Sequence, residues 1–297
     1  MQHKTILVTG ASGFVGRSLC QHFSKHGYEL RQLSRKVGAE FFWDPASGQL
    51  DQRVLNGVDV VVHLAGEPIA QRWTSAVKQR IMQSRVASTE LLVQAMLAQA
   101  KPPALILASG INYYGYQVAE TLQESSELGA GFLAEVCAAW EGAADPLRAA
   151  GARVCCVRTG VVLGAAGGAL AKMLPAFRLG LGGPLGSGMQ MMSWISLADL
   201  VRVYQFVTEV DSLQGALNAV SPAAVSNFAF TKALGSVIRR PTVLPMPSWL
   251  VRALFGTMAN ETLLADLTVR PTRLEAAGFH WRSSTIESAL AAIFKEA

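Results

Sequence analysis

The sequence predicts an α/β fold with a doubly wound parallel sheet of the Rossmann type and a smaller C-terminal covering region. In the first half, short apolar runs alternate with longer amphipathic stretches, which is typical of a parallel sheet wrapped by helices. The runs are almost entirely apolar, as expected for strands that are covered on both faces. We therefore expect a nucleotide-binding region over 1–165, whose sheet later segments complete, and a covering region over 166–297.

The expected elements follow in order along the chain. The first strand leads into a helix with apolar residues at i, i+4 spacing, which Gly27 ends. A long helix over 74–100 stops before Pro102-Pro103, because proline cannot continue it, and another helix is expected over 133–150. After about Gly160 the alternation weakens. The core strands are predicted at 5–8, 29–33, 59–64, 104–108 and 153–157.

Composition narrows the class of protein. Hydrophobic residues make up 51% of the 297 residues and charged residues 16%, which indicates a globular chain. No apolar run approaches the ~18 residues of a membrane helix, and none resembles a signal peptide, so we expect a cytoplasmic protein without a membrane partner. The net charge is +5, but the basic residues are scattered, and we expect no nucleic-acid partner. The four cysteines lack zinc-ligand spacing, and no metal is expected.

A glycine turn between the first strand and the first helix carries the strongest chemical signal. Gly10 permits a tight turn, Gly13 lets the backbone approach a pyrophosphate, and Gly16 lets the helix pack closely on the strand. The free amides and the dipole at the helix start favour phosphate. The predicted cofactor-binding residues of this turn are Gly10, Ser12, Gly13, Phe14, Val15 and Gly16.

The end of the second strand predicts which dinucleotide binds. An NAD-specific fold usually places an acidic residue there, whereas this chain has Ser34, Arg35 and Lys36. A hydroxyl and a planar guanidinium suit the 2′-phosphate of NADP(H). A solvated basic loop is the alternative. Because of its position at the strand end, we predict NADP(H) rather than NAD(H).

The third strand ends in small residues that would let the chain pass close to the cofactor. We predict contacts from Leu64, Ala65 and Gly66, and we interpret His63 as a hydrogen-bonded core histidine. Arg85, in the long helix, either turns inward toward the cofactor or lies exposed.

At these residues the chain resembles the extended short-chain dehydrogenase/reductases, the superfamily of NAD-dependent epimerases and dehydratases. It is most similar to an atypical branch, the YfcH-like "epimerase family" proteins, and the resemblance extends over nearly the whole chain. It implies NADP(H) binding and a substrate-covering C-terminal region, with a family-specific segment over 245–297. The motifs that carry the resemblance are TGASGFVG (9–16), LSRK (33–36), HLAGEPIA (63–70), VRTGVVL (157–163), GLGGPLGSG (180–188), NAVSP (218–222) and RPTRL (270–274).

This chain lacks part of the superfamily's proton shuttle. Its members use a serine with a Tyr-x-x-x-Lys pair, in which lysine lowers the pKa of the tyrosine. The serine is retained as Ser109, but the pair falls at Leu133 and Cys137. We predict Ser109 as a cofactor-side and catalytic residue, with Tyr113 or Tyr114 as a substitute acid. A tyrosine pair that only packs against the cofactor or the substrate cover is the alternative.

Two functions remain open from the sequence. The first is an oxidoreductase or epimerase that acts on an unknown small carbonyl or sugar-like substrate. The second is a non-catalytic NADPH-binding sensor or partner-binding protein. A monomer or a homodimer is expected. The chain also departs from the branch at Asn112, where a glycine is usual.

Overall fold

A single sheet of eight strands forms the centre of the computed structural model, which describes residues 4–295. Neighbouring strands are parallel throughout, except that β4 is antiparallel to β3. In spatial order the strands are β4 (Gln49–Leu50), β3 (Phe41–Asp44), β2 (Glu29–Ser34), β1 (Thr5–Thr9), β5 (Val60–His63), β6 (Ala104–Gly110), β8 (Val154–Thr159) and β12 (Gly215–Ala219). This order confirms the predicted doubly wound α/β fold.

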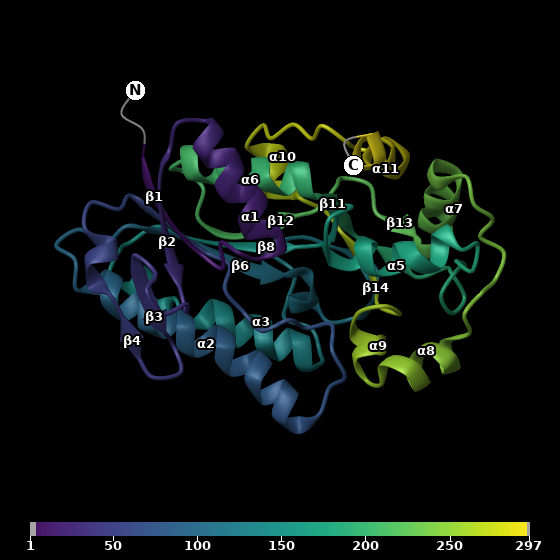
Figure 1. The fold of residues 1–297 in the computed structure, drawn as a ribbon, viewed down its shortest axis with the longest axis horizontal. Helices are drawn as coiled ribbons and strands as arrows, with labels where there is room; N and C mark the ends of the chain where they lie inside the picture. Colours follow the sequence, from purple (N-terminus) through teal and green to yellow (C-terminus); the bar gives the residue numbers. More distant parts are fainter. Residues whose placement is uncertain (1–3, 296–297) are drawn as a thin grey trace.

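Helices cover both faces of the sheet (Figure 1). One face packs against α1 (Phe14–Lys25) and α6 (Leu197–Glu209), and the other against α2 (Ser75–Leu97), α3 (Phe132–Gly142) and α4 (Asp145–Ala149). Alternate residues of β1, β5, β6 and β8 point into two separate apolar clusters, which explains the nearly continuous apolar runs. From β1 the chain adds β2, β3 and β4 on one side, and then returns to add β5 on the other side. Ligands bind outside the carboxyl ends of the strands at such a reversal.

Two sequence expectations need correction. The helix expected over 133–150 is divided into α3 and α4, because Pro146 starts a new helix in its first turn, where its missing N–H is tolerated. The antiparallel extension β3–β4 and the short 3₁₀ helix η1 (Gln52–Leu55) were not expected from the sequence.

The second half of the chain adds one strand to the main sheet and builds a smaller lobe beside it. β12 completes the sheet, and α5 (Gly168–Arg178), α7 (Asn227–Ile238) and α11 (Ile286–Lys295) share a third apolar cluster. The short helix pair α8 (Ser248–Phe255) and α9 (Met258–Glu261) lies below them in Figure 1. Within residues 4–295, no helix has the length and apolar character needed to cross a membrane.

Three small strand pairs lie outside the main sheet, and two of them connect this lobe to the Rossmann half. Both η2 (Ile111–Tyr114) and β7 leave the main sheet after β6, and β7 then pairs with a strand of the C-terminal segment. Another helix, α10 (Thr272–Ala276), packs on β12. The pairs are β7 (Gln117–Leu122) with β14 (Asp266–Val269), β9 (Val161–Leu163) with β11 (Trp194–Ser196), and β10 (Met191–Met192) with β13 (Val225–Ser226).

Candidate functional site

The glycine turn has a backbone geometry that only glycine permits. Gly10 has a φ of +67°, and a Cβ at Gly16 would lie 2.2 Å from the carbonyl oxygen of Gly10. The cap residue of α1 is Gly13, which has no side chain to bond the first amides, and the first turn carries no acidic residue. The start of α1 is therefore a cradle of free N–H groups of the kind that binds phosphate.

The other residues of the turn face different neighbours. Ser12 is exposed, and its carbonyl oxygen accepts a hydrogen bond from Arg17 at 3.2 Å. The ring of Phe14 packs on the loop before α5, where a Cβ at Gly167 would lie 2.4 Å from it. Val15 lines a cavity described below. The turn thus joins the cofactor cradle to the C-terminal lobe.

The end of β2 presents a hydroxyl and an uncompensated cation. Ser34 Oγ accepts a hydrogen bond from the backbone N–H of Lys36 at 3.1 Å. Arg35 is exposed and forms no ion pair with any residue between 4 and 295. A guanidinium without a carboxylate partner is free to pair with a phosphate.

His63 is a satisfied core residue, as the sequence analysis assumed. Thr9 Oγ1 accepts from the backbone amides of Leu64 and Ala65, both at 3.2 Å, so its hydroxyl proton is left for His63 Nδ1 at 2.6 Å. His63 Nε2 then donates to Ser88 Oγ at 3.0 Å. Burial, together with the nearby Arg85 cation, lowers the pKa of His63 to about 3, which keeps the ring neutral.

Arg85 turns inward rather than lying on the surface. Its side chain is buried and donates to the carbonyl oxygens of Glu67 and Ile81, both at 3.1 Å. Its guanidinium carbon lies 5.0 Å from the ring centre of Trp140, and a Cβ at Gly66 would lie 3.1 Å from that carbon. Burial lowers the pKa of Arg85. The small residue at position 66 is what leaves room for this cation.

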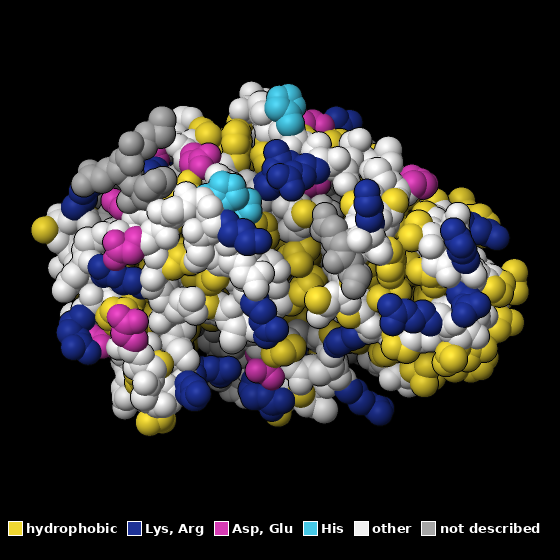
Figure 2. All heavy atoms as spheres, turned by 45° about the horizontal axis from the view of Figure 1, so that its top comes forward, with side chains coloured by type: hydrophobic (Ala, Val, Ile, Leu, Met, Phe, Trp, Pro, Cys, Tyr) yellow, Lys and Arg dark blue, Asp and Glu magenta, His cyan; other side chains and the backbone are white. Residues whose placement is uncertain are grey.

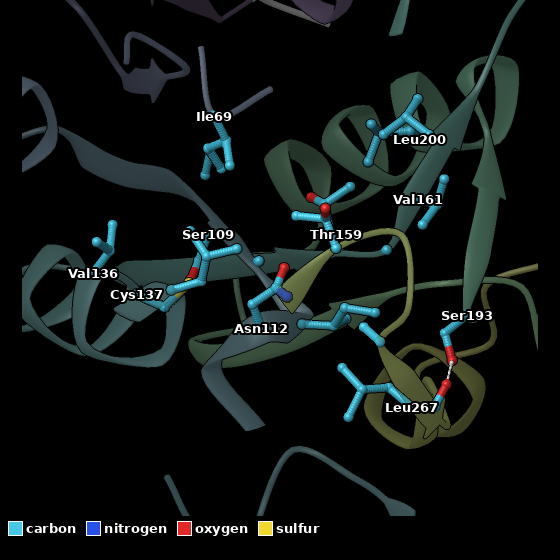
Figure 3. Close-up of a pocket in the computed structure, with 18 of the residues that line it drawn as sticks. Ile69, Ser109, Asn112, Val136, Cys137, Thr159, Val161, Ser193, Leu200 and Leu267 are labelled. Atoms are coloured by element: carbon cyan, nitrogen blue, oxygen red, sulfur yellow. Dashed lines mark hydrogen bonds between the residues drawn. The ribbon is translucent and has the colours of Figure 1, made fainter. Parts of the chain in front are cut away.

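A cavity of about 410 Å³ opens at the carboxyl ends of the central strands, within the range of small-molecule sites. Most of its lining is apolar, and Figure 3 shows Ser109, Asn112 and Thr159 among the side chains around it. Residues from both halves of the chain line the cavity, among them Val15, Leu64, Arg85, Ser109, Asn112, Leu133, Cys137, Thr159, Ser193, Thr262 and Leu267.

Ser109 is held by a buried ion pair. Its hydroxyl donates to Glu141 Oε1 at 2.7 Å, and Arg158 binds both oxygens of Glu141 at 2.9 and 2.8 Å. All three side chains are buried. Because the Ser109 proton is committed to Glu141, the Ser109 oxygen is left to accept a hydrogen bond from the cavity.

The positions of the missing Tyr-x-x-x-Lys pair form an apolar wall of α3. Leu133 and Cys137 both line the cavity. Burial raises the pKa of the Cys137 thiol to about 11, so the thiol stays protonated at neutral pH. Neither side chain can reproduce the tyrosine and lysine chemistry.

The structure does not bring Tyr113 or Tyr114 into the cavity; within the part of the chain it describes, neither belongs to the lining. The Tyr114 hydroxyl donates to Asn218 at 2.8 Å and accepts from Arg158 at 3.0 Å, and burial raises its pKa. The Tyr113 ring stacks on the Arg158 guanidinium at 3.4 Å. Both rings therefore support the ion pair behind Ser109.

Other polar residues that line the cavity were not predicted from the sequence. Asn112 reaches it from η2 and donates to the carbonyl oxygen of Glu261 at 2.8 Å. Its only signal was the departure from a usual glycine. Ser193 Oγ donates to the carbonyl oxygen of Leu267 at 2.9 Å (Figure 3), and no motif marked it.

The C-terminal segment forms part of the cavity wall and holds α3. Glu261 accepts hydrogen bonds from the backbone amides of Phe132 and Leu133, at 3.1 and 2.8 Å, and so caps a helix that lacks a capping side chain of its own. Thr262 and Leu267 line the cavity directly. The wall of α3 and the C-terminal segment are thus one structural unit.

A strand–glycine turn–helix start of this geometry in a doubly wound sheet defines a Rossmann-type nucleotide-binding protein. The model of the NAD dependent epimerase/dehydratase family matches residues 6–220, and a domain of unknown function, DUF1731, matches residues 246–293. The chain belongs to the NAD dependent epimerase/dehydratase family. The predicted resemblance, with its distinct C-terminal segment, is confirmed.

Similar proteins share this organisation over their whole length. An epimerase family protein of Mycobacterium bovis is 43% identical over 294 residues, which cover 98% of this chain and 97% of that protein. The epimerase family protein SDR39U1 of Mus musculus is 38% identical, with coverage of 96% and 98%. The crystal structure of human SDR39U1 with NADPH has a TM-score of 0.90 at 34% identity and covers 99% of this chain and 100% of that one.

Proposed function

We propose that this protein is an NADP(H)-dependent oxidoreductase or epimerase that acts on a small, largely apolar carbonyl compound. One observation carries the proposal: a single cavity is lined by residues of the glycine turn and the β5 end, Val15 and Leu64, and also by Ser109. A cofactor held in the glycine cradle would therefore share a compartment with the substrate.

The residues present fit NADP(H). The cradle at Gly10, Gly13 and Gly16 would take the pyrophosphate, and Ser34 with the unpaired Arg35 would take the 2′-phosphate. Leu64, Ala65 and Gly66 would pass along the cofactor, with Arg85 beneath them. NADPH is the ligand in the crystal structure of the human relative, which agrees with this assignment.

Ser109 would orient the reacting oxygen. The bound dinucleotide supplies a hydride at its nicotinamide ring. Hydride transfer to the carbonyl carbon breaks the C=O π bond and leaves a negative charge on the oxygen, and water would supply the proton that makes this oxygen a hydroxyl group, since Leu133 and Cys137 cannot and the tyrosine hydroxyls lie outside the cavity. Because Ser109 donates to Glu141, its oxygen would accept a hydrogen bond from the hydroxyl group of this alcohol product and fix its position. The apolar lining favours a carbonyl compound over a sugar with many hydroxyls.

The same apolar wall supports a second candidate, a non-catalytic NADPH sensor. Leu133 and Cys137 replace the two residues on which the superfamily's proton transfer depends. In a sensor, the cofactor would order the cavity without turnover.

Titration with NADPH and NADH tests the cofactor assignment. Arg35→Ala should raise the dissociation constant of NADPH roughly ten- to a hundred-fold, because a charge-assisted bond is lost, and leave that of NADH unchanged. Lys25→Ala, an exposed cation at the far end of α1, is the matched control. Equal affinity for both cofactors in the unmodified protein would refute the assignment.

A carbonyl panel separates the two candidates. We expect NADPH oxidation with at least one apolar carbonyl compound, and a Ser109→Ala variant that binds NADPH normally but turns over more slowly. Tight NADPH binding without turnover on any compound would favour the sensor.

A further inference from the structure

The C-terminal lobe carries an exposed apolar surface unlike any other part of the molecule. Nine of the twelve large hydrophobic side chains that are exposed between residues 4 and 295 lie between positions 179 and 255. We call these nine residues the apolar face: Leu179, Leu181, Met189, Phe228, Val243, Leu244, Trp249, Leu254 and Phe255. Trp249 is 67% exposed, an unusual position for the largest apolar side chain.

These residues come from segments that contact one another. The loop after α5 runs beside the segment before α8, since Leu185 bridges to Met246 and Arg240 Nε donates to the carbonyl oxygen of Arg178 at 2.9 Å. The backbone N–H of Phe228 donates to the carbonyl oxygen of Gly188 at 2.8 Å. The apolar face is therefore one continuous region made of two loops, the start of α7 and α8.

The charged side chains around this face are nearly all basic. The chain contains no Asp or Glu between Asp145 and Asp199, nor between Asp211 and Glu261. Besides Lys172, which donates to the carbonyl oxygen of Ala70 at 3.4 Å, five cations are exposed in the same segments, and none forms an ion pair with any described residue: Arg178, Lys232, Arg239, Arg240 and Arg252. Figure 2 shows hydrophobic and basic side chains gathered at this end of the molecule.

The two acidic groups that follow α8 in the sequence already accept hydrogen bonds. Glu261 caps α3, and Asp266 accepts a hydrogen bond from the backbone N–H of Met191 at 2.8 Å. The five cations are therefore available to an external partner.

We propose that the apolar face docks on an anionic phospholipid bilayer. Exposed Trp and Leu side chains enter the boundary between headgroups and acyl chains, while the surrounding Lys and Arg side chains pair with lipid phosphates. A bilayer surface demands no shape complementarity, which suits side chains spread over two loops and a short helix. Surface docking needs no membrane-spanning helix, so the lack of one among residues 4–295 does not oppose it.

A second copy of this chain fits the face less well. In a two-fold dimer the same surface meets itself. Five unpaired cations would then face the same five cations, and Asp266, which shares a pocket with Met189 and Arg252, supplies only one carboxylate against them. Charge complementarity therefore favours an anionic partner.

Vesicle co-sedimentation of the full chain tests the proposal. We expect binding to vesicles that mix phosphatidylglycerol with phosphatidylcholine, little binding to phosphatidylcholine alone, and a sharp loss between about 0.1 M and about 1 M salt, where the screening length falls from about 10 to about 3 Å. Trp249→Ser with Leu254→Ser should weaken binding roughly ten-fold or more. Arg178→Glu with Lys232→Glu should weaken it by at least roughly five-fold per cation.

Matched surface changes elsewhere provide the control. Leu128→Ser and Lys101→Glu alter an exposed leucine and an exposed lysine outside the apolar face, and both should bind vesicles like the unmodified protein. The proposal is overturned if anionic vesicles do not bind the chain, or if both double variants bind them normally while folded by circular dichroism. It is also overturned if light scattering shows a lipid-free dimer that Trp249→Ser with Leu254→Ser dissociates, because the face then covers a second copy.

Discussion

The glycine turn and the α3 wall contribute to one cavity from the two faces of the sheet, but the turn depends on its backbone atoms and the wall on its side chains. At the turn, backbone amides and missing Cβ atoms form the site, as at Gly16. On α3, the superfamily's chemistry depends on two side chains, and Leu133 and Cys137 have replaced them without disturbing the helix. Cofactor binding can therefore persist in a fold whose proton transfer has been lost or rerouted.

The difference follows from what each region must preserve. A Cβ in the turn collides with the backbone, so the glycines are required by packing as well as by any ligand. Leu133 and Cys137 are buried, and Leu133 packs against Val77 and Ile81 of α2, so the wall remains packed. Substitutions at the turn should thus lower both stability and cofactor affinity. Substitutions on the wall should change one of these without the other.

Gly16→Ala is the most disruptive test of the turn. The added Cβ would lie 2.2 Å from the Gly10 carbonyl oxygen, so β1 and α1 must move apart. We expect a loss of measurable NADPH binding and a fall of about 5 kcal/mol or more in the free energy of unfolding. Urea unfolding and NADPH titration measure the two effects.

Gly57→Ala is the control, since Gly57 also has a positive φ, +70°, but has open space around it. It should cost only about 1–2 kcal/mol. A Gly16→Ala variant with normal NADPH affinity would show that the turn is not the dinucleotide site.

Glu141→Gln tests the support behind Ser109. Arg158 would remain buried without a carboxylate, and the side-chain exposure of the pair is only 5% and 11%. Breaking such a pair costs about 3–5 kcal/mol, which urea unfolding measures. Glu275→Gln, in a more exposed pair with Arg270, should cost less than about 1 kcal/mol. Equal costs for the two variants would contradict the role of burial.

The sequence predicted the turn better than the wall for a physical reason. Glycine spacing reports a local backbone geometry, and Gly10, Gly13 and Gly16 lie within one turn of chain. The surroundings of Ser109 depend on residues far apart in sequence, such as Glu141, Arg158 and Asn218, which only the tertiary fold brings together. Position in the sequence had suggested Tyr113 and Tyr114 as acids. Whether a side chain reaches the cavity depends on its direction, however, and both rings point to Arg158 instead.

The buried His63 beside the turn predicts a pH dependence of stability. Its pKa is about 3 in the folded protein and about 6.5 in the unfolded chain. The unfolded chain therefore binds the extra proton between these values, so stability is complete above pH ~6.5 and falls as the pH drops toward ~3, by up to about 1.4 kcal/mol per pH unit.

Urea unfolding between neutral pH and pH ~5 should detect this slope. His63→Gln should flatten the slope, whereas His280→Gln, which alters an exposed histidine, should leave it unchanged. An unaltered slope in His63→Gln would mean that other groups carry the acid sensitivity.

The smallest expected effect concerns how the C-terminal segment holds the α3 wall. Glu261→Gln weakens the cap on Phe132 and Leu133 by removing the charge that favours a helix N-terminus. We expect a loss of about 1 kcal/mol in unfolding free energy. We also expect a change in the KM of any substrate, because Leu133 is bound by the cap through its backbone N–H and lines the cavity with its side chain. Glu120→Gln, an exposed residue of β7, is the control. If Glu261→Gln shifted NADPH affinity but not stability, the C-terminal segment would act on the cofactor side of the cavity, and the separation between turn and wall would fail.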